Sequence, residues 1–96
     1  MNIYKNLKYD LRKETIDEIF SSPKIRVERI TSSGQTTDWF NQDENELVIL
    51  LEGEAIIRFL DKELTIKKGD VINIPSNQIH KTINLSNTCL WLCIFY

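Results

Sequence analysis

A chain of 96 residues has room for one compact domain with a single hydrophobic core. Apolar residues make up 42% of it, with only three glycines and two prolines, which excludes disordered, collagen-like and linker-type sequences. The formal charge of −2 comes from 14 acidic and 12 basic residues mixed along the chain, so no basic patch suited to nucleic acid or a membrane surface is present.

The N-terminal residues are polar and lack the apolar stretch of a secretion signal. The longest apolar runs, Leu47–Leu51 and Cys89–Tyr96, are far too short to form a membrane helix. We therefore expect a soluble, cytoplasmic protein that binds neither membrane nor nucleic acid.

The first regular element is predicted to be a short helix over Lys13–Phe20. Ile16, Ile19 and Phe20 fall on one side of such a helix, and charged residues fall on the other. Pro23 ends it, because a residue before proline is biased away from the helical conformation.

After Pro23 the chain reads as short strands separated by turn residues. The predicted strands are Ile25–Thr31, Thr36–Asn41, Glu46–Leu51, Ala55–Leu60, Glu63–Lys67, Val71–Ile74, His80–Leu85 and Thr88–Tyr96. Such a series is typical of an all-β sandwich or barrel. We therefore expect an N-terminal extension with a short helix over residues 1–23 and a barrel over residues 24–96.

The last predicted strand is apolar on both faces. One face carries Cys89, Trp91, Cys93 and Phe95, and the other carries Leu90, Leu92, Ile94 and Tyr96. A strand of this kind has to be covered on both sides, which leads us to expect a homodimer. The two cysteines would lie about 13 Å apart on one strand, beyond disulfide reach, so we expect them to be core thiols.

Two polar residues stand out in this apolar framework. If no bulge intervenes, the following residues share one face: Phe40, Gln42, Glu46, Val48 and Leu50. A carboxylate at Glu46 that points inward needs a hydrogen-bonding partner or a cation; otherwise it lies at the wet start of its strand, beside Asp43 and Glu44. His80, the only histidine, opens a strand that carries Asn84 on the same face.

Two spaced patterns connect these residues. The first runs Gly34, Phe40-Asn41-Gln42, Glu46, Gly53, and the second runs Gly69, Pro75-Ser76-Asn77, His80, Asn84. Their spacing resembles the two motifs of the cupin superfamily over Ile25–Tyr96. The resemblance implies a small single-domain cupin, which is a jelly-roll β-barrel. Asn77 stands where the motif has a turn glycine, a mild change because Asn tolerates positive φ.

The resemblance also implies where a metal would bind. Metal-binding cupins use two histidines and a glutamate from the first motif and a histidine from the second. Glu46 and His80 stand at two of these positions, whereas Phe40 and Gln42 replace the two histidines. The implied ligands are therefore Gln42, Glu46 and His80, and the implied metal is Zn²⁺, Mn²⁺, Fe²⁺ or Ni²⁺, bound weakly for want of two imidazoles.

The alternative is a site without metal. Glu46 and His80 would then hydrogen-bond each other, and the Glu46 carboxylate would raise the pKa of His80. The pair would serve as a general acid and base or would bind the polar end of a small-molecule ligand. Asn84 would orient His80. The wall of the cavity inside the barrel is expected to consist of Phe40, Val48, Ile72, Ile74 and Trp91. The expected ligand-binding residues are Phe40, Gln42, Asn84 and Trp91.

The resulting functional hypothesis is a small stand-alone cupin that binds a metal ion, a small molecule or both around Glu46 and His80. An enzyme of this kind would resemble metal-dependent cupins, which include dioxygenases, sugar isomerases and decarboxylases. The alternative is a degenerate cupin that acts as a ligand-binding sensor or a protein-interaction module. One scaffold hosts many functions, so the sequence leaves open whether the protein is an enzyme.

Overall fold

The computed structural model describes all 96 residues and contains eight strands and no helix. The strands are β1 (Thr15–Ser21), β2 (Arg26–Ser32), β3 (Glu46–Glu52), β4 (Glu54–Phe59), β5 (Glu63–Lys67), β6 (Val71–Ile74), β7 (His80–Asn84) and β8 (Cys89–Phe95). The all-β class expected from the sequence is confirmed. Because the chain has no helix, it has none that could span a membrane.

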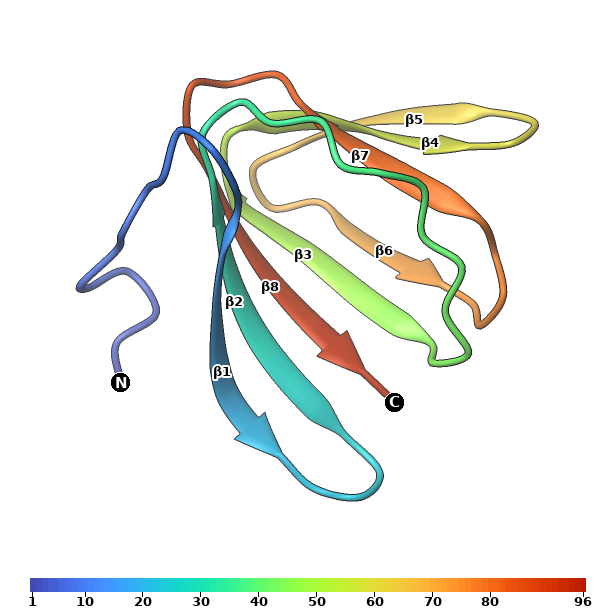
Figure 1. Cartoon of the computed structure of the whole chain (residues 1–96), viewed down its shortest axis with the longest axis horizontal. Coiled ribbons are helices and arrows are strands. Elements are labelled where there is room, and N and C mark those ends of the chain that lie inside the picture. Colours follow the sequence, from blue (N-terminus) through green and yellow to red (C-terminus); the bar gives the residue numbers. More distant parts are fainter.

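The strands form two antiparallel sheets (Figure 1). The larger sheet has the order β1-β2-β8-β3-β6, and the smaller has the order β5-β4-β7. The sheets meet where β3 turns through Gly53 into β4, and they diverge away from that turn (Figure 1).

The hydrophobic core lies between the two sheets. Alternation along β3 and β8 turns one side chain in two toward it, as expected for strands in a two-layer fold. Its eleven buried residues are Val48, Leu50, Ala55, Ile57, Phe59, Ile66, Ile74, Cys89, Trp91, Cys93 and Phe95. Both cysteines are free thiols in this core, which confirms the expectation for them.

The helix expected over Lys13–Phe20 is wrong, because Thr15–Ser21 forms the edge strand β1, paired with β2. The register shifts between Glu18 and Phe20, so Ile19 is an extra residue in a β-bulge. Ile16, Ile19 and Phe20 have the sequence spacing of a helix face, but the bulge places Ile16 and Phe20 on opposite faces of the strand. Hydrogen bonding to the edge of β2 therefore makes this segment a strand, despite the helix-like spacing of its apolar residues.

The strand expected over Thr36–Asn41 is also wrong. Residues 33–45 form a loop beside β7, drawn in green in Figure 1, and two isolated bridges, Thr36–Ile83 and Phe40–His80, connect the loop to that strand. Between the bridges, the Thr37 hydroxyl accepts the backbone N–H of Thr82 at 3.0 Å. A side-chain oxygen thus replaces a ladder carbonyl, and no continuous strand forms.

The N-terminal segment lies on the outer face of the larger sheet. The buried Arg29 guanidinium donates to the carbonyls of Ile3, Lys5 and Asn6 and pairs with Asp17 at 2.8 Å. These contacts satisfy a buried charge and fix the segment over one part of that face.

The rest of the outer face is apolar and uncovered within the chain. The cross-strand rows consist of Phe20, Val27, Ile94 and Leu47, and of Leu92, Ile49 and Val71. Phe20 and Val71 are more than half exposed, and the other five are half-buried. We call these seven residues the outer apolar face.

Candidate functional site

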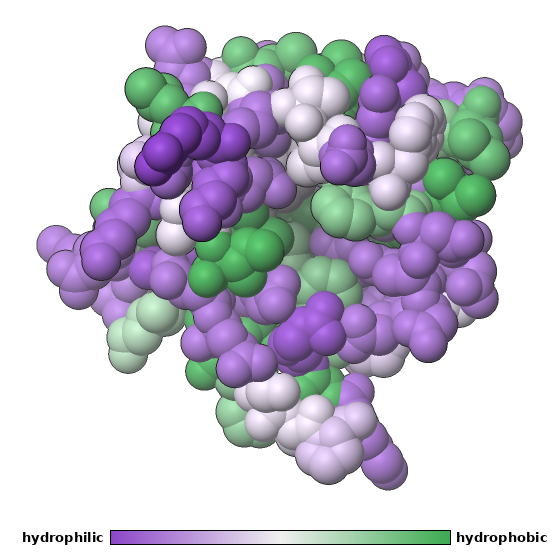
Figure 2. Space-filling view, in the orientation of Figure 1, coloured by the Kyte–Doolittle hydropathy of each residue, from purple (hydrophilic) through white to green (hydrophobic).

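A cavity of about 290 Å³ lies between the two sheets and opens on one side of the molecule. Figure 2 shows the hollow in this surface, with apolar side chains inside it and mostly hydrophilic residues around it. Both sheets and the loop 33–45 supply its walls.

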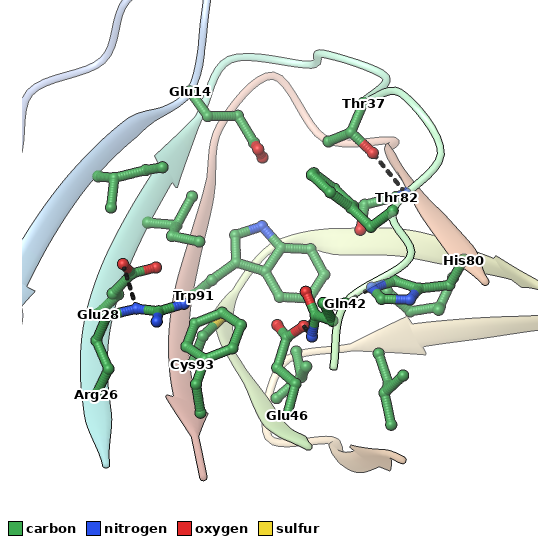
Figure 3. Close-up of a pocket in the computed structure, with 17 residues that line it drawn as sticks. Glu14, Arg26, Glu28, Thr37, Gln42, Glu46, His80, Thr82, Trp91 and Cys93 are labelled. Carbon is green, nitrogen blue, oxygen red and sulfur yellow. Dashed lines mark hydrogen bonds and ion pairs between the residues drawn. The ribbon is translucent and has the colours of Figure 1, made fainter. Parts of the chain in front are cut away.

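The polar centre of the cavity is built from Glu46 and His80, which are 8% and 3% exposed (Figure 3). Each is the first residue of its strand, β3 and β7, and the two strands belong to different sheets. Glu46 Oε1 lies 3.7 Å from His80 Nε2, which is an ion-pair distance rather than the hydrogen bond we expected. Gln42 Nε2 donates a hydrogen bond to the same Oε1 at 3.0 Å.

The orientation of the imidazole is fixed from its other side. His80 Nδ1 lies 2.9 Å from the carbonyl oxygen of Gln78, and because a carbonyl only accepts, Nδ1 carries the hydrogen. Nε2 is therefore the atom that gains or loses a proton, and it faces Glu46. Burial lowers the pKa of His80, but the Glu46 carboxylate and the Gln78 carbonyl together raise it above 6.5.

Aromatic rings surround the imidazole. The Phe40 ring is tilted against it at a centroid distance of 5.7 Å, and Phe59 lies at 6.4 Å. The Phe40 backbone exchanges two hydrogen bonds with the backbone of His80, at 2.7 and 3.1 Å. This pairing holds an apolar side chain beside the ion pair and limits the access of water.

Asn84 does not orient His80, as we expected from the sequence. It makes no hydrogen bond to His80; its Oδ1 accepts the indole N–H of Trp91 at 3.0 Å, and its amide donates to the Gln35 carbonyl at 2.8 Å. Asn84 therefore orients Trp91, whose indole lines the cavity, and does not itself form the wall.

The structure brings most of the remaining predicted residues together. The cavity lining includes Phe40, Gln42, Glu46, Val48, Ile74, His80 and Trp91. Ile72, expected in the wall, packs against the core instead. Asn77 has a φ of 61°, so the conformation expected of a glycine replacement is confirmed.

Sequence reasoning missed three charged residues of the lining: Glu14, Arg26 and Glu28. Arg26 Nε donates to Glu28 at 3.1 Å, its Nη1 donates to Glu44 at 3.0 Å, and the guanidinium stands 4.2 Å from the centre of the Phe95 ring. Arg26 and Glu28 are alternate residues of the strand expected over Ile25–Thr31, so their shared face could have been predicted from the sequence. Nothing in the sequence pattern pointed to Glu14.

Cys93 also lines the cavity, but it is not suited to nucleophilic chemistry. Burial, followed by the nearby Glu46 carboxylate, raises the pKa of the Cys93 thiol well above its usual value of 9.0. The thiol therefore stays protonated, and the protonated form is a poor nucleophile.

The donor set does not fit a transition-metal centre. One imidazole and one carboxylate face each other, and no group of three His, Cys, Asp or Glu side chains is present to hold a metal ion. The third expected ligand, Gln42, presents its amide nitrogen to Glu46, and an amide nitrogen is a hydrogen-bond donor rather than a ligand.

Comparisons with known proteins agree on the architecture. The family model described as a cupin domain matches residues 27–95. The uncharacterised protein YdbB of Bacillus subtilis (strain 168) is 41% identical over 59 residues, which are 59% of this chain and 51% of that protein. The chain thus matches about half the length of this curated relative.

Solved structures of low sequence identity share the fold. A candidate mannose-6-phosphate isomerase from Ralstonia eutropha JMP134 has a TM-score of 0.89 at 20% identity and covers 99% of this chain and 94% of its own. A cupin superfamily protein from Desulfitobacterium hafniense DCB-2 has a TM-score of 0.84 at 19% identity, with coverages of 93% and 82%. These likenesses confirm the jelly-roll fold and leave the activity open.

Proposed function

The chain belongs to the cupin domain family, and from this premise we propose that it binds a small organic molecule in its cavity without a metal centre. The observation that carries the proposal is the buried Glu46–His80 pair in a mainly apolar cavity of about 290 Å³. A concave apolar site with a few converging polar groups is the usual form of a small-molecule site.

The chemistry of the centre indicates how such a ligand is held. Glu46 offers carboxylate oxygens as acceptors, and protonated His80 offers the Nε2 hydrogen as a donor. Because both groups are buried, a hydrogen bond to a ligand gains strength there. The cavity volume lies at the small end of the range for ligand sites, so we expect a compact ligand.

A fragment screen against the untagged protein tests the proposal. We expect binding fragments to raise the melting temperature and to shift the NMR signals of His80 and Trp91. Glu46→Gln and His80→Ala are expected to abolish the rise in melting temperature and the shift of the Trp91 signal. Glu52→Gln is the matched control, because Glu52 ends the same strand and pairs with Lys68 on the surface.

The same samples test the metal alternative. Elemental analysis of the wild type is expected to find no metal near one equivalent per chain, and added Zn²⁺, Mn²⁺, Fe²⁺ and Ni²⁺ are expected to leave the melting temperature unchanged. Near-stoichiometric metal that disappears in both Glu46→Gln and His80→Ala would overturn the metal-free proposal. Fragments that bind equally well to those variants would contradict the assigned site.

A further inference from the structure

The cavity contains one carboxylate that has no cationic partner. Of the three carboxylates in its lining, Glu28 pairs with Arg26 and Glu46 pairs with His80. Glu14 takes part in none of the seven ion pairs of the molecule. The lining therefore carries an excess of negative charge, and the excess is located at Glu14.

Two neutral donors hold this carboxylate in place. The hydroxyl of Ser32, which is fully buried, donates to Glu14 Oε2 at 2.6 Å, and the Asn84 amide lies 3.5 Å from the same oxygen. Asn84 is itself fixed by Trp91 and Gln35. Glu14 Oε1 makes no hydrogen bond within the protein, so one oriented acceptor remains for another molecule.

The surroundings of Glu14 suit an organic cation. In Figure 3, Glu14 and Glu46 lie at different ends of the cavity, with the Trp91 indole between them. The unpaired carboxylate of Glu14 can accept a charge-assisted hydrogen bond from an ammonium group, and the apolar wall at Ile16 and Ile30 accepts hydrocarbon. A ligand carboxylate or phosphate would instead meet uncompensated negative charge.

We propose that Glu14 is a specificity-determining residue that selects a small organic molecule carrying an ammonium group. The inference rests on the proposed function and names the ligand class of the same cavity. The ammonium would bind Glu14 Oε1 beside the indole of Trp91, while the rest of the ligand reaches toward Glu46 and His80.

The selecting group comes from outside the part of the chain that matches the family model. Glu14 precedes residues 27–95, and its segment is anchored to the loop by the Gln35 amide, which donates to the Asp10 carbonyl at 2.6 Å. The N-terminal segment thus supplies a functional group that the family pattern does not contain.

Three probes with the same ring and different charge test the inference: cyclohexylammonium, cyclohexanol and cyclohexanecarboxylate. NMR titration of the Trp91 indole N–H gives a dissociation constant for each. We expect the wild type to bind the ammonium about tenfold tighter than the alcohol, the difference expected of one charge-assisted hydrogen bond. The carboxylate is expected to bind weakest.

Glu14→Gln should abolish this preference while leaving the affinity for cyclohexanol unchanged, because the amide carbonyl still accepts from Ser32. Glu52→Gln is the control and should retain the preference, since Glu52 lies outside the cavity and pairs with Lys68 on the surface. Cyclohexylammonium that binds no better than cyclohexanol, fails to bind, or keeps its advantage in Glu14→Gln would overturn the inference. The fragment screen judges the proposed function separately, because it includes neutral and anionic compounds.

Discussion

At the scale of single residues, the protonation of one imidazole is governed by one carboxylate. His80 is buried, which alone would lower its pKa, yet the Glu46 carboxylate and the Gln78 carbonyl raise the pKa above 6.5. A pKa raised by folding stabilises the native state fully below the unfolded value of 6.5, and this contribution is lost as pH rises through the folded pKa.

Glu46→Gln is therefore expected to lower the pKa of His80, because the negative charge facing Nε2 is removed. His80 is the only histidine, so an NMR titration of its ring protons reports this pKa without assignment. We expect the variant to be destabilised by about 1–3 kcal/mol near pH 6, with the deficit shrinking toward pH 8.5.

Glu44→Gln is the control for that experiment, since Glu44 pairs with Arg26 at 3.0 Å and not with the imidazole. A His80 pKa that is the same in the wild type and in Glu46→Gln would contradict the assigned electrostatic coupling.

At the scale of elements, the turn between β3 and β4 leaves no space for a side chain at Gly53. Gly53 has a φ of +100°, and a Cβ placed on it would lie 2.7 Å from Cys89 Sγ and 2.8 Å from the Thr88 carbonyl oxygen. This glycine therefore meets two requirements at once: an unusual backbone conformation and a close approach to β8.

Gly53→Ala is expected to destabilise the protein by about 3–5 kcal/mol, because backbone strain and a steric clash add together. Gly69→Ala provides the comparison: its φ is +92°, but nothing lies within 4 Å of the added Cβ. We expect Gly69→Ala to cost about 1–2 kcal/mol. Urea denaturation measures both, and equal losses would mean that the clash at Gly53 is relieved by movement of β8.

The alternation of the later strands was sufficient to predict most elements, and the motif spacing predicted the jelly roll. The two wrong elements lie where the local sequence is compatible with more than one backbone conformation. Ile16 and Phe20 are four residues apart, as on one face of a helix, but the bulge at Ile19 places them on opposite faces of β1. Thr37 interrupts a ladder with its own hydroxyl. Both outcomes depend on a neighbouring strand that is remote in the sequence.

The site was predictable to the extent that its residues belong to the two motifs. Gln42, Glu46 and His80 all follow from motif spacing, and the structure places all three together. Glu14 could not be found in this way, because its place in the cavity depends on contacts with Ser32 and Asn84, which are remote from it in the sequence.

At the scale of the whole molecule, the outer apolar face is the surface on which we expect the homodimer predicted from the two-sided β8 to form. Its seven residues lie in two adjacent rows, beside the part of the sheet that the N-terminal segment covers. We propose that a second copy of the chain covers this face, because burial of such a patch is favourable.

Light scattering is expected to give twice the chain mass of 11.3 kDa at micromolar concentration. Val71→Lys, at the edge of the face and 57% exposed, should produce monomers because it places a charge in the interface. Leu60→Lys is the control: it is 72% exposed and lies in the turn between β4 and β5. A monomeric wild type, or equal dissociation by both variants, would contradict the proposal.

The two thiols of β8 provide a chemical probe of the motions that expose this strand to solvent. Cys89 is fully buried and Cys93 is 3% exposed, and burial raises the pKa of both thiols above 9.0. Alkylating reagents at neutral pH therefore react only during excursions that expose the strand. Of the two thiols, only Cys93 lines the cavity. The ratio of the two labelling rates therefore distinguishes local opening of the cavity from separation of the two sheets. A ligand bound in the cavity would slow the labelling of Cys93 more than that of Cys89.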